Sequence, residues 1–162
     1  MEEDYKKEIE KLKEEIKELK KDKEKESFLT ETLRWLNIGE AKSKVYLYLL
    51  KKKRATAKEI MEEARLYPTT VREVLTEMVK EGVLEREKIE TENVGRNPYI
   101  YNAVSPLEIT KKRIAVLEKG VSELLSLDIE TSRKEMKFKP PLIPVKIEIK
   151  ISETKKKESP EK

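Results

Sequence analysis

Apolar residues recur along much of this chain at spacings of three and four, the pattern of amphipathic helices. Within residues 1–26 the apolar positions are Tyr5, Ile9, Leu12, Ile16 and Leu19. They form a heptad seam with isoleucine at a and leucine at d, which favours a parallel pair of helices. Because this seam spans only about two and a half heptads, a solvated single helix is an equal alternative.

Residues 27–104 have the pattern of a globular domain. A helix is predicted over residues 28–36, with Ser27 or Thr30 as its cap. A second helix is predicted over residues 40–52. Its apolar face consists of Ala41, Val45, Tyr48 and Leu49.

Two further short helices are predicted with a turn between them. Thr56 and Glu59 form a capping box, and the helix that they open ends near Ala64. Thr69 is then predicted to cap a helix near residues 70–81. The buried stripe of this second helix is Val71, Val74, Leu75, Met78 and Val79. This order of elements predicts a helix-turn-helix.

A hairpin is predicted directly after the helix-turn-helix. Gly82 ends the preceding helix as a left-handed cap. Residues 83–90 and 99–104 alternate as two strands, and residues 93–98 have the composition of a turn. The predicted fold is mostly α with a small β-hairpin wing. It is a winged helix-turn-helix flanked by long, coiled-coil-like helices at both ends.

Residues 105–137 are predicted to form a long helix, which Ser105 and Glu108 open as a capping box. Its apolar positions form another heptad seam: Leu107, Ile114, Leu117, Val121 and Leu124. Gly120 lies within this helix and weakens it by about 1 kcal/mol relative to alanine. We expect the seam to pair with a second copy of the chain, giving a homodimer. Packing on its own domain is the alternative.

Residues 138–162 form a tail. In residues 145–151, valine and isoleucine alternate with lysine and glutamate, the pattern of a strand with no hairpin partner nearby. A lone strand is unstable, so it is expected to add to another sheet, including that of a partner protein, or to stay disordered. The charged residues at the end are predicted to be disordered.

Composition narrows the function classes. The 162 residues include no cysteine, histidine or glutamine, and 43% are charged. Without cysteine and histidine the usual zinc ligands and the commonest general base are missing, so we expect neither an enzyme nor a cofactor. The lack of glutamine beside many lysines and glutamates is typical of thermophilic proteins, and an archaeal source is our hypothesis.

No apolar run approaches the length of a membrane span, and the N-terminus lacks the apolar segment of a secretion signal. A cytoplasmic, nucleoid-associated protein with no membrane partner is therefore expected. The net charge of +4 and the pI near 9.0 mildly favour nucleic acid as a partner.

The second helix of the helix-turn-helix is shaped to enter a DNA major groove. Its outward side carries Thr69, Thr70, Arg72, Glu73, Thr76 and Lys80. Arginine can bind guanine with both arms of its fork, and glutamate can accept from cytosine. Supporting contacts are expected from Lys52, Arg54, Thr56 and Lys58, and at the hairpin tip from Asn93, Arg96 and Asn97. These residues predict double-stranded DNA as the partner.

The charge of this helix argues in the other direction. Between Thr69 and Glu81 it carries two basic and three acidic residues, which phosphate attraction would not select. The alternative is therefore a winged-helix adaptor that binds protein in a transcription or chromosome-associated complex.

Five short motifs resemble the TrmB-like transcription regulators of archaea. Their first helix usually has Leu-Gly-Leu-Thr, a spacer, Glu-Ala-Lys-Val-Tyr and Leu-Leu, and Leu36–Leu50 here reads LNIGEAKSKVYLYLL. The other similar motifs are Ala55–Ile60, Val71–Leu75, Gly82–Leu84 and Asn102–Pro106. The resemblance covers roughly residues 33–125.

The chain also departs from the family pattern. Gly39 stands where threonine or serine is usual, Lys42 and Ser43 replace Glu-Ala, and Arg72 often corresponds to tyrosine. The sugar-binding domain of the larger members has no counterpart. The resemblance implies a winged helix-turn-helix and a dimeric, DNA-binding regulator of transcription without an obvious small-molecule sensor.

Overall fold

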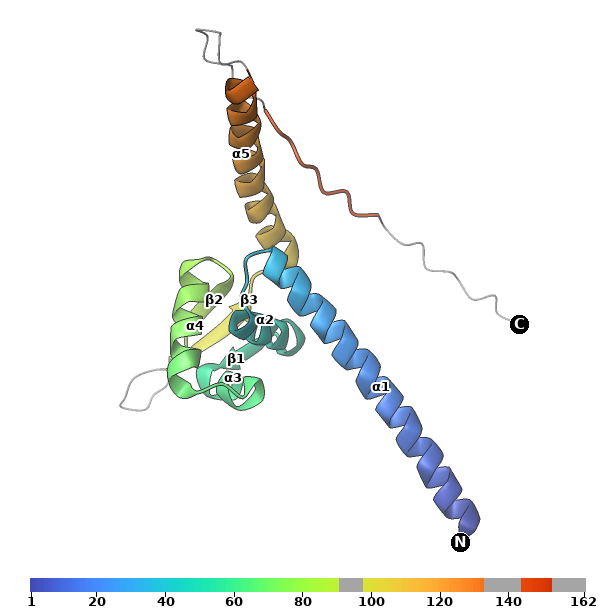
Figure 1. Cartoon of the computed structure of the whole chain (residues 1–162). Helices are drawn as coiled ribbons and strands as arrows, with labels where there is room; N and C mark the ends of the chain where they lie inside the picture. The colour runs from blue at the N-terminus through green and yellow to red at the C-terminus, as the bar shows by residue number, and fades with distance from the viewer. Residues whose placement is uncertain (91–97, 133–143, 153–162) are drawn as a thin grey trace, which may run out of the picture. The chain divides into compact units, whose positions relative to one another are not determined.

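A computed structural model of the chain describes residues 1–90, 98–132 and 144–152. They belong to two compact units, which comprise residues 1–109 and the described part of residues 110–162. The first unit holds a winged helix-turn-helix, and Figure 1 labels its elements. The elements in chain order are α1 (Glu2–Trp35), α2 (Glu40–Lys52), β1 (Arg54–Thr56), α3 (Ala57–Ala64), α4 (Pro68–Lys80), β2 (Leu84–Lys88), β3 (Tyr99–Ala103) and α5 (Pro106–Ser132). The mostly α fold with a small β wing that the sequence predicts is therefore confirmed.

The N-terminal helix α1 is continuous over 34 residues. The prediction that a separate helix begins at Ser27 or Thr30 is wrong. The hydroxyls of Thr30 and Thr32 donate to the carbonyls of Glu26 and Phe28 one turn earlier, at 2.9 and 3.0 Å. Because these hydroxyls bond within the helix, they cap no new one.

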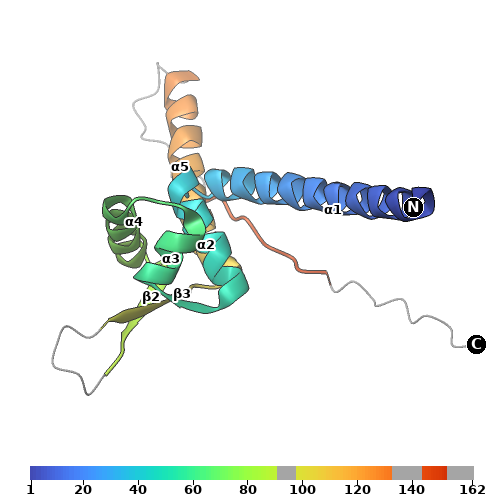
Figure 2. The same cartoon turned by 90° about the horizontal axis from the view of Figure 1, so that it is seen from below.

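The sheet has three antiparallel strands in the order β1-β3-β2. The predicted hairpin is confirmed by β2 and β3, which pair from Leu84 with Ala103 to Lys88 with Tyr99. Figure 2 shows the hairpin extending past α3 and α4. The sequence analysis missed β1, in which Ala55 lies opposite Tyr101. Three residues are too few for strand alternation to be visible, and the open edge of β3 provides the pairing.

The two helices of the helix-turn-helix begin in different ways. At α3 the predicted capping box of Thr56 and Glu59 is present. The prediction that Thr69 caps the next helix is wrong, because α4 begins two residues earlier than expected, at Pro68, with Tyr67 as its cap. Proline suits the first helical position because its missing N–H would lack a helical partner there. Gly82 has a φ of 71°, the left-handed conformation expected after the end of α4.

One hydrophobic core holds the first unit together. The central helix α2 contributes Val45, Tyr46, Leu47 and Leu49, and α4 contributes Val71, Val74, Leu75 and Met78. Leu33 near the end of α1 and Ile109 in the first turns of α5 are buried in the same core. The C-terminal end of α1 and the N-terminal end of α5 are therefore part of this domain's core.

The second unit contains α5 beyond Ile109 and the tail residues 144–152. The predicted end of this helix at residue 137 lies outside the described residues. The backbone N–H of Ile147 donates to the Glu118 carboxylate at 2.7 Å. Residues 144–152 have no regular secondary structure in the single chain, so their pairing as a strand stays a prediction.

Candidate nucleic-acid interface

The outer face of α4 is open to solvent. Its buried residues Val71, Val74, Leu75 and Met78 turn into the core. Thr69, Arg72, Glu73, Thr76 and Lys80 are exposed on the other side, and Thr70 is half-buried. The sequence placed these six residues on the outward side, and only Thr70 is partly covered.

Lys42 of α2 pairs with two acidic residues, Glu77 of α4 and Glu81, which caps the end of α4. The Lys42 ammonium lies 3.0 Å from a carboxylate oxygen of Glu77 and 2.8 Å from one of Glu81. The hydrogen bond to Glu81 is the largest cause of a raised pKa for Lys42, which therefore stays charged. One ammonium offsets only one of the two carboxylates, so together with Arg72, Lys80 and Glu73 the charges at α4 sum to zero. Lys42 thus removes the excess negative charge that the sequence gives to this helix.

Sequence reasoning missed this role of Lys42. The residue differs from the usual pattern of the resembling family, and it lies 39 positions before Glu81. Only the packing of α2 against α4 brings the two together. An excess of acid on α4 beside an unusual lysine on α2 was the available clue.

The basic residues at positions 51–54 do not form one surface. Arg54 forms an ion pair with Glu87 of β2 at 3.0 Å, with both side chains 60% exposed. Lys51 and Lys52 lie on α2 and line a cavity. Lys58 is exposed on α3. Arg54 is thus tied to the wing, whereas Lys52 and Lys58 form no ion pair within the described residues.

Two of the predicted contact threonines already donate their hydroxyls within the chain. Thr56 donates to the Glu59 carboxylate at 3.0 Å, and Thr76 donates to the Arg72 carbonyl at 2.7 Å. The hydrogen bond from the Thr56 backbone N–H lowers the pKa of Glu59 below its usual value. Thr56 therefore serves the start of α3, and a phosphate contact would have to replace its bond to Glu59.

The wing is held by contacts between its two strands. The Arg86 guanidinium lies 4.7 Å from the centre of the Tyr99 ring, a cation–π distance. Asn102 donates to the Glu85 carboxylate at 2.9 Å. The tip residues predicted to bind DNA, Asn93, Arg96 and Asn97, lie outside the described residues.

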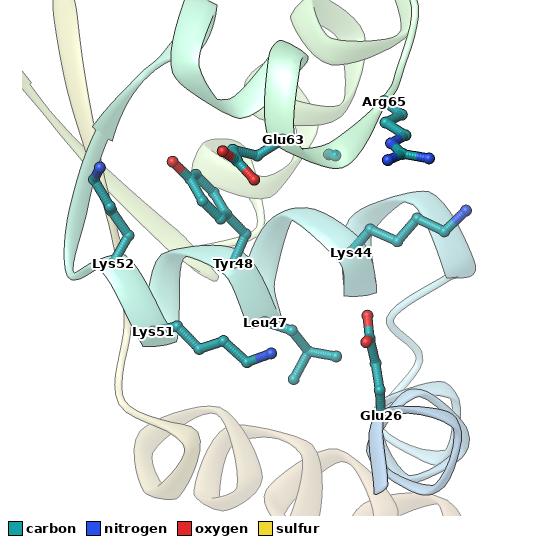
Figure 3. Close-up of a pocket in the computed structure, with 9 residues that line it drawn as sticks. Glu26, Lys44, Leu47, Tyr48, Lys51, Lys52, Glu63 and Arg65 are labelled. Carbon is teal, nitrogen blue, oxygen red and sulfur yellow. The ribbon is translucent and has the colours of Figure 1, made fainter. Parts of the chain in front are cut away.

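A mixed-charge cavity of about 690 Å³ lies between α2, the end of α3 and Glu26 of α1. Its cationic residues are Lys44, Lys51, Lys52 and Arg65, and its acidic residues are Glu26 and Glu63. Figure 3 shows the side chains of Tyr48 and Glu63 pointing toward one another. The excess of positive charge suits an anion, while the two carboxylates oppose one. The sequence analysis did not identify this cavity, because its lining comes from three separate segments.

The predicted dimerisation residues differ in exposure. On α5, Leu107, Ile114 and Val121 are half-buried, whereas Leu117 and Leu124 are 54% and 66% exposed. On α1, Ile9, Leu12 and Ile16 are each 51% exposed, and Leu19 is 68% exposed. Both seams therefore present apolar side chains that the rest of the described chain does not cover.

The described residues lack the features of a membrane-spanning helix and of a clustered metal site. No described helix is both long and apolar enough to span a bilayer. The same residues contain no cluster of three or more acidic side chains that could hold a metal ion.

Comparison with known proteins agrees with this fold. The family model described as "Sugar-specific transcriptional regulator TrmB" matches residues 33–107, so the resemblance to TrmB-like regulators is confirmed over that segment. None of the curated proteins matches the chain.

Two solved structures illustrate the likeness. A possible transcriptional regulator from Methanosarcina mazei Go1 aligns with a TM-score of 0.51 and 18% identity, over 62% of this chain and 82% of that one. This likeness concerns the fold. A mutant of MarR from E. coli, complexed with operator DNA, has a TM-score of 0.43 and 17% identity over 70% and 82% of the two chains.

Proposed function

Because residues 33–107 match the TrmB regulator family, we propose that this protein binds double-stranded DNA through α4 and regulates transcription as a homodimer. The observation that carries the proposal is the exposed face of α4. Thr69, Arg72 and Lys80 are accessible there, and Lys42 of α2 pairs with Glu77 and Glu81 and so reduces the negative charge of the helix. A helix with this face suits the width of a major groove.

The remaining contacts divide by type. Arg72 and Glu73 are proposed to read base edges, and Thr69, Thr70, Thr76 and Lys80 to contact phosphates or bases beside them. Lys52, Arg54, Thr56 and Lys58, with the tip residues Asn93, Arg96 and Asn97, are proposed to hold the backbone. Arg54 would exchange its partner Glu87 for phosphate.

The assembly and setting are part of the same proposal. Pairing is proposed through the α5 seam, with the α1 seam assisting, so that two α4 helices meet one duplex. The tail strand at residues 145–151 is proposed to add to another sheet, in a second copy or in a protein partner. We place the protein on the nucleoid in the cytoplasm of a thermophilic archaeon, on the composition described above.

The test is duplex binding by fluorescence anisotropy across a range of salt concentrations. Arg72→Ala with Lys80→Ala is expected to weaken binding about tenfold or more. If both residues contact phosphates, the slope of log affinity against log salt falls by up to about 2. The matched control, Lys7→Ala with Lys21→Ala, removes the same charge from exposed positions of α1 and should leave binding nearly unchanged.

Selection from a pool of random duplexes separates the remaining alternatives. Enrichment of one sequence identifies a specific regulator, and equal binding of all duplexes identifies an architectural protein. If the chain binds no duplex at low salt, the DNA proposal is wrong and the protein-binding adaptor takes its place.

A further inference from the structure

The N-terminal part of α1 carries an apolar stripe that no other described element covers. Tyr5, Ile9, Leu12, Ile16 and Leu19 are between 51% and 68% exposed. They repeat every three and four residues on one continuous helix. Single exposed leucines are ordinary, but five apolar residues in a regular line form a surface that another helix can bury.

The charges beside the stripe identify the occupant as a second copy of α1 in parallel orientation. Glu8 and Glu15 flank one side of the stripe, at g, and Lys13 and Lys20 flank the other, at e. In a parallel pair each glutamate lies next to the lysine five residues further along the partner. An antiparallel pair would place glutamate beside glutamate and lysine beside lysine. These four side chains form no ion pair within the described part of the single chain.

The residues that follow mark where such a pair ends. The next a and d positions are Lys23 and Glu26, which are both exposed. One heptad later the d position is Leu33, which is 7% exposed and belongs to the core of its own domain. The same stripe thus faces solvent as far as Leu19 and the domain core at Leu33. Lys23 and Glu26 separate the exposed part of the stripe from the part that is buried in the domain core.

We infer that residues 5–22 of two chains form a parallel, in-register coiled coil that separates at Lys23 and Glu26. This inference rests on the proposed homodimer but requires no DNA. The coil is short, and isolated helices of this length are marginal in water. Its formation therefore depends on the domains already being held together, which raises the local concentration of α1. For this reason the tests use the full chain.

Disulfide crosslinking tests the orientation without interference, because the sequence contains no cysteine. In a parallel coil, Tyr5→Cys and Leu19→Cys each crosslink to themselves under mild oxidation. In an antiparallel pair centred on Leu12, only a mixture of the two variants crosslinks. Lys7→Cys and Lys21→Cys, which have the same separation but lie on the outward side, should crosslink far more slowly. Rates equal to those of these controls, or crosslinking in the mixture alone, overturn the inference.

Charge exchange tests the register. Glu8→Lys with Glu15→Lys, and separately Lys13→Glu with Lys20→Glu, each place like charges together. Each double variant, combined with Leu19→Cys, should lose the crosslink, and mixing the two should restore it as a heterodimer. If both double variants crosslink as well as Leu19→Cys alone, the charge pairing is absent.

The outcomes distinguish this inference from the proposed function. If the protein crosslinks as expected but binds no duplex, the coiled coil is supported and the DNA proposal is wrong. If the protein binds DNA as a dimer but does not crosslink through α1, only the coiled-coil inference is wrong.

Discussion

Tyr46 is a buried tyrosine whose hydroxyl joins α2 to the residue that follows β3. It is 1% exposed, and its hydroxyl donates to the carbonyl of Val104 at 2.8 Å. Burial disfavours the phenolate and raises the pKa of Tyr46 to about 12. The hydrogen bond and the raised pKa both depend on the native packing, so unfolding breaks the hydrogen bond and returns the pKa of Tyr46 to its ordinary value.

Tyr46→Phe is expected to lower the free energy of unfolding by about 1–3 kcal/mol at pH 8, because the Val104 carbonyl loses its donor. The tyrosine contributes fully below the ordinary pKa of 10.0 and loses its contribution as pH rises toward the folded value of about 12. The gap between wild type and variant should therefore shrink by about 1 kcal/mol by pH 11. Urea unfolding of both proteins at pH 8 and pH 11 measures it. An equal gap at the two pH values would contradict this account.

At single residues the sequence analysis succeeded where local chemistry decides the outcome. The Thr56–Glu59 capping box and the Gly82 cap need only their neighbours, and both are present. It was less complete for α2, where it placed Tyr48 on the buried face and did not identify Tyr46. Tyr48 is only half-buried, whereas Tyr46 is almost fully buried. Because α2 contacts several elements at once, a single amphipathic face does not describe it.

At the scale of elements, the Lys42 pairs connect α2 with α4 and set the charge that α4 presents. Lys42→Met releases Glu77 and Glu81, so the proposed reading helix becomes more acidic near a duplex. Affinity for DNA should fall although Lys42 belongs to α2 and not to the proposed reading helix. Stability should fall by only about 1 kcal/mol, because the glutamates are solvent-exposed.

Compensation tests the physical reason for this effect. Adding Glu77→Gln and Glu81→Gln to Lys42→Met removes the released charges and should recover most of the lost affinity. Fluorescence anisotropy measures binding, and a thermal unfolding curve checks that each variant is folded. Affinity that stays low in the triple variant would show that Lys42 acts in another way.

Element boundaries show what periodicity can and cannot predict. The stripe of α4 predicted its buried face correctly, since four residues of one helix turn into one core. Its start was placed too late, because Pro68 was assigned to the turn rather than to the first helical position. The break expected inside α1 does not occur, because hydroxyls that could cap a helix can equally bond within one. The exposed face of α4 could be predicted from the sequence. The positive charge of Lys42 beside it could not, because that residue belongs to α2.

At the scale of the whole molecule, a substitution at Gly120 can show whether α5 pairs with a second copy or remains a single helix. It is exposed within the helix, and a Cβ added there would meet no atom within 4 Å. Nothing in the described chain therefore requires glycine at this position. Leu117 and Leu124 lie three positions before and four positions after it and are both largely exposed. A close approach of a second α5 at this point would account for the glycine.

Gly120→Ala gives opposite results in the two cases. In a single helix alanine is better by about 1 kcal/mol, so the melting temperature should rise at every protein concentration. In the proposed dimer the added methyl group separates the helices, so sedimentation should show weaker association and the melting temperature should fall at high concentration. Leu117→Asp supplies the dissociated reference, because pairing would bury its charge. A variant with higher stability and unchanged association would show that α5 does not pair at Gly120, and the dimer contact would then have to lie elsewhere along the seam.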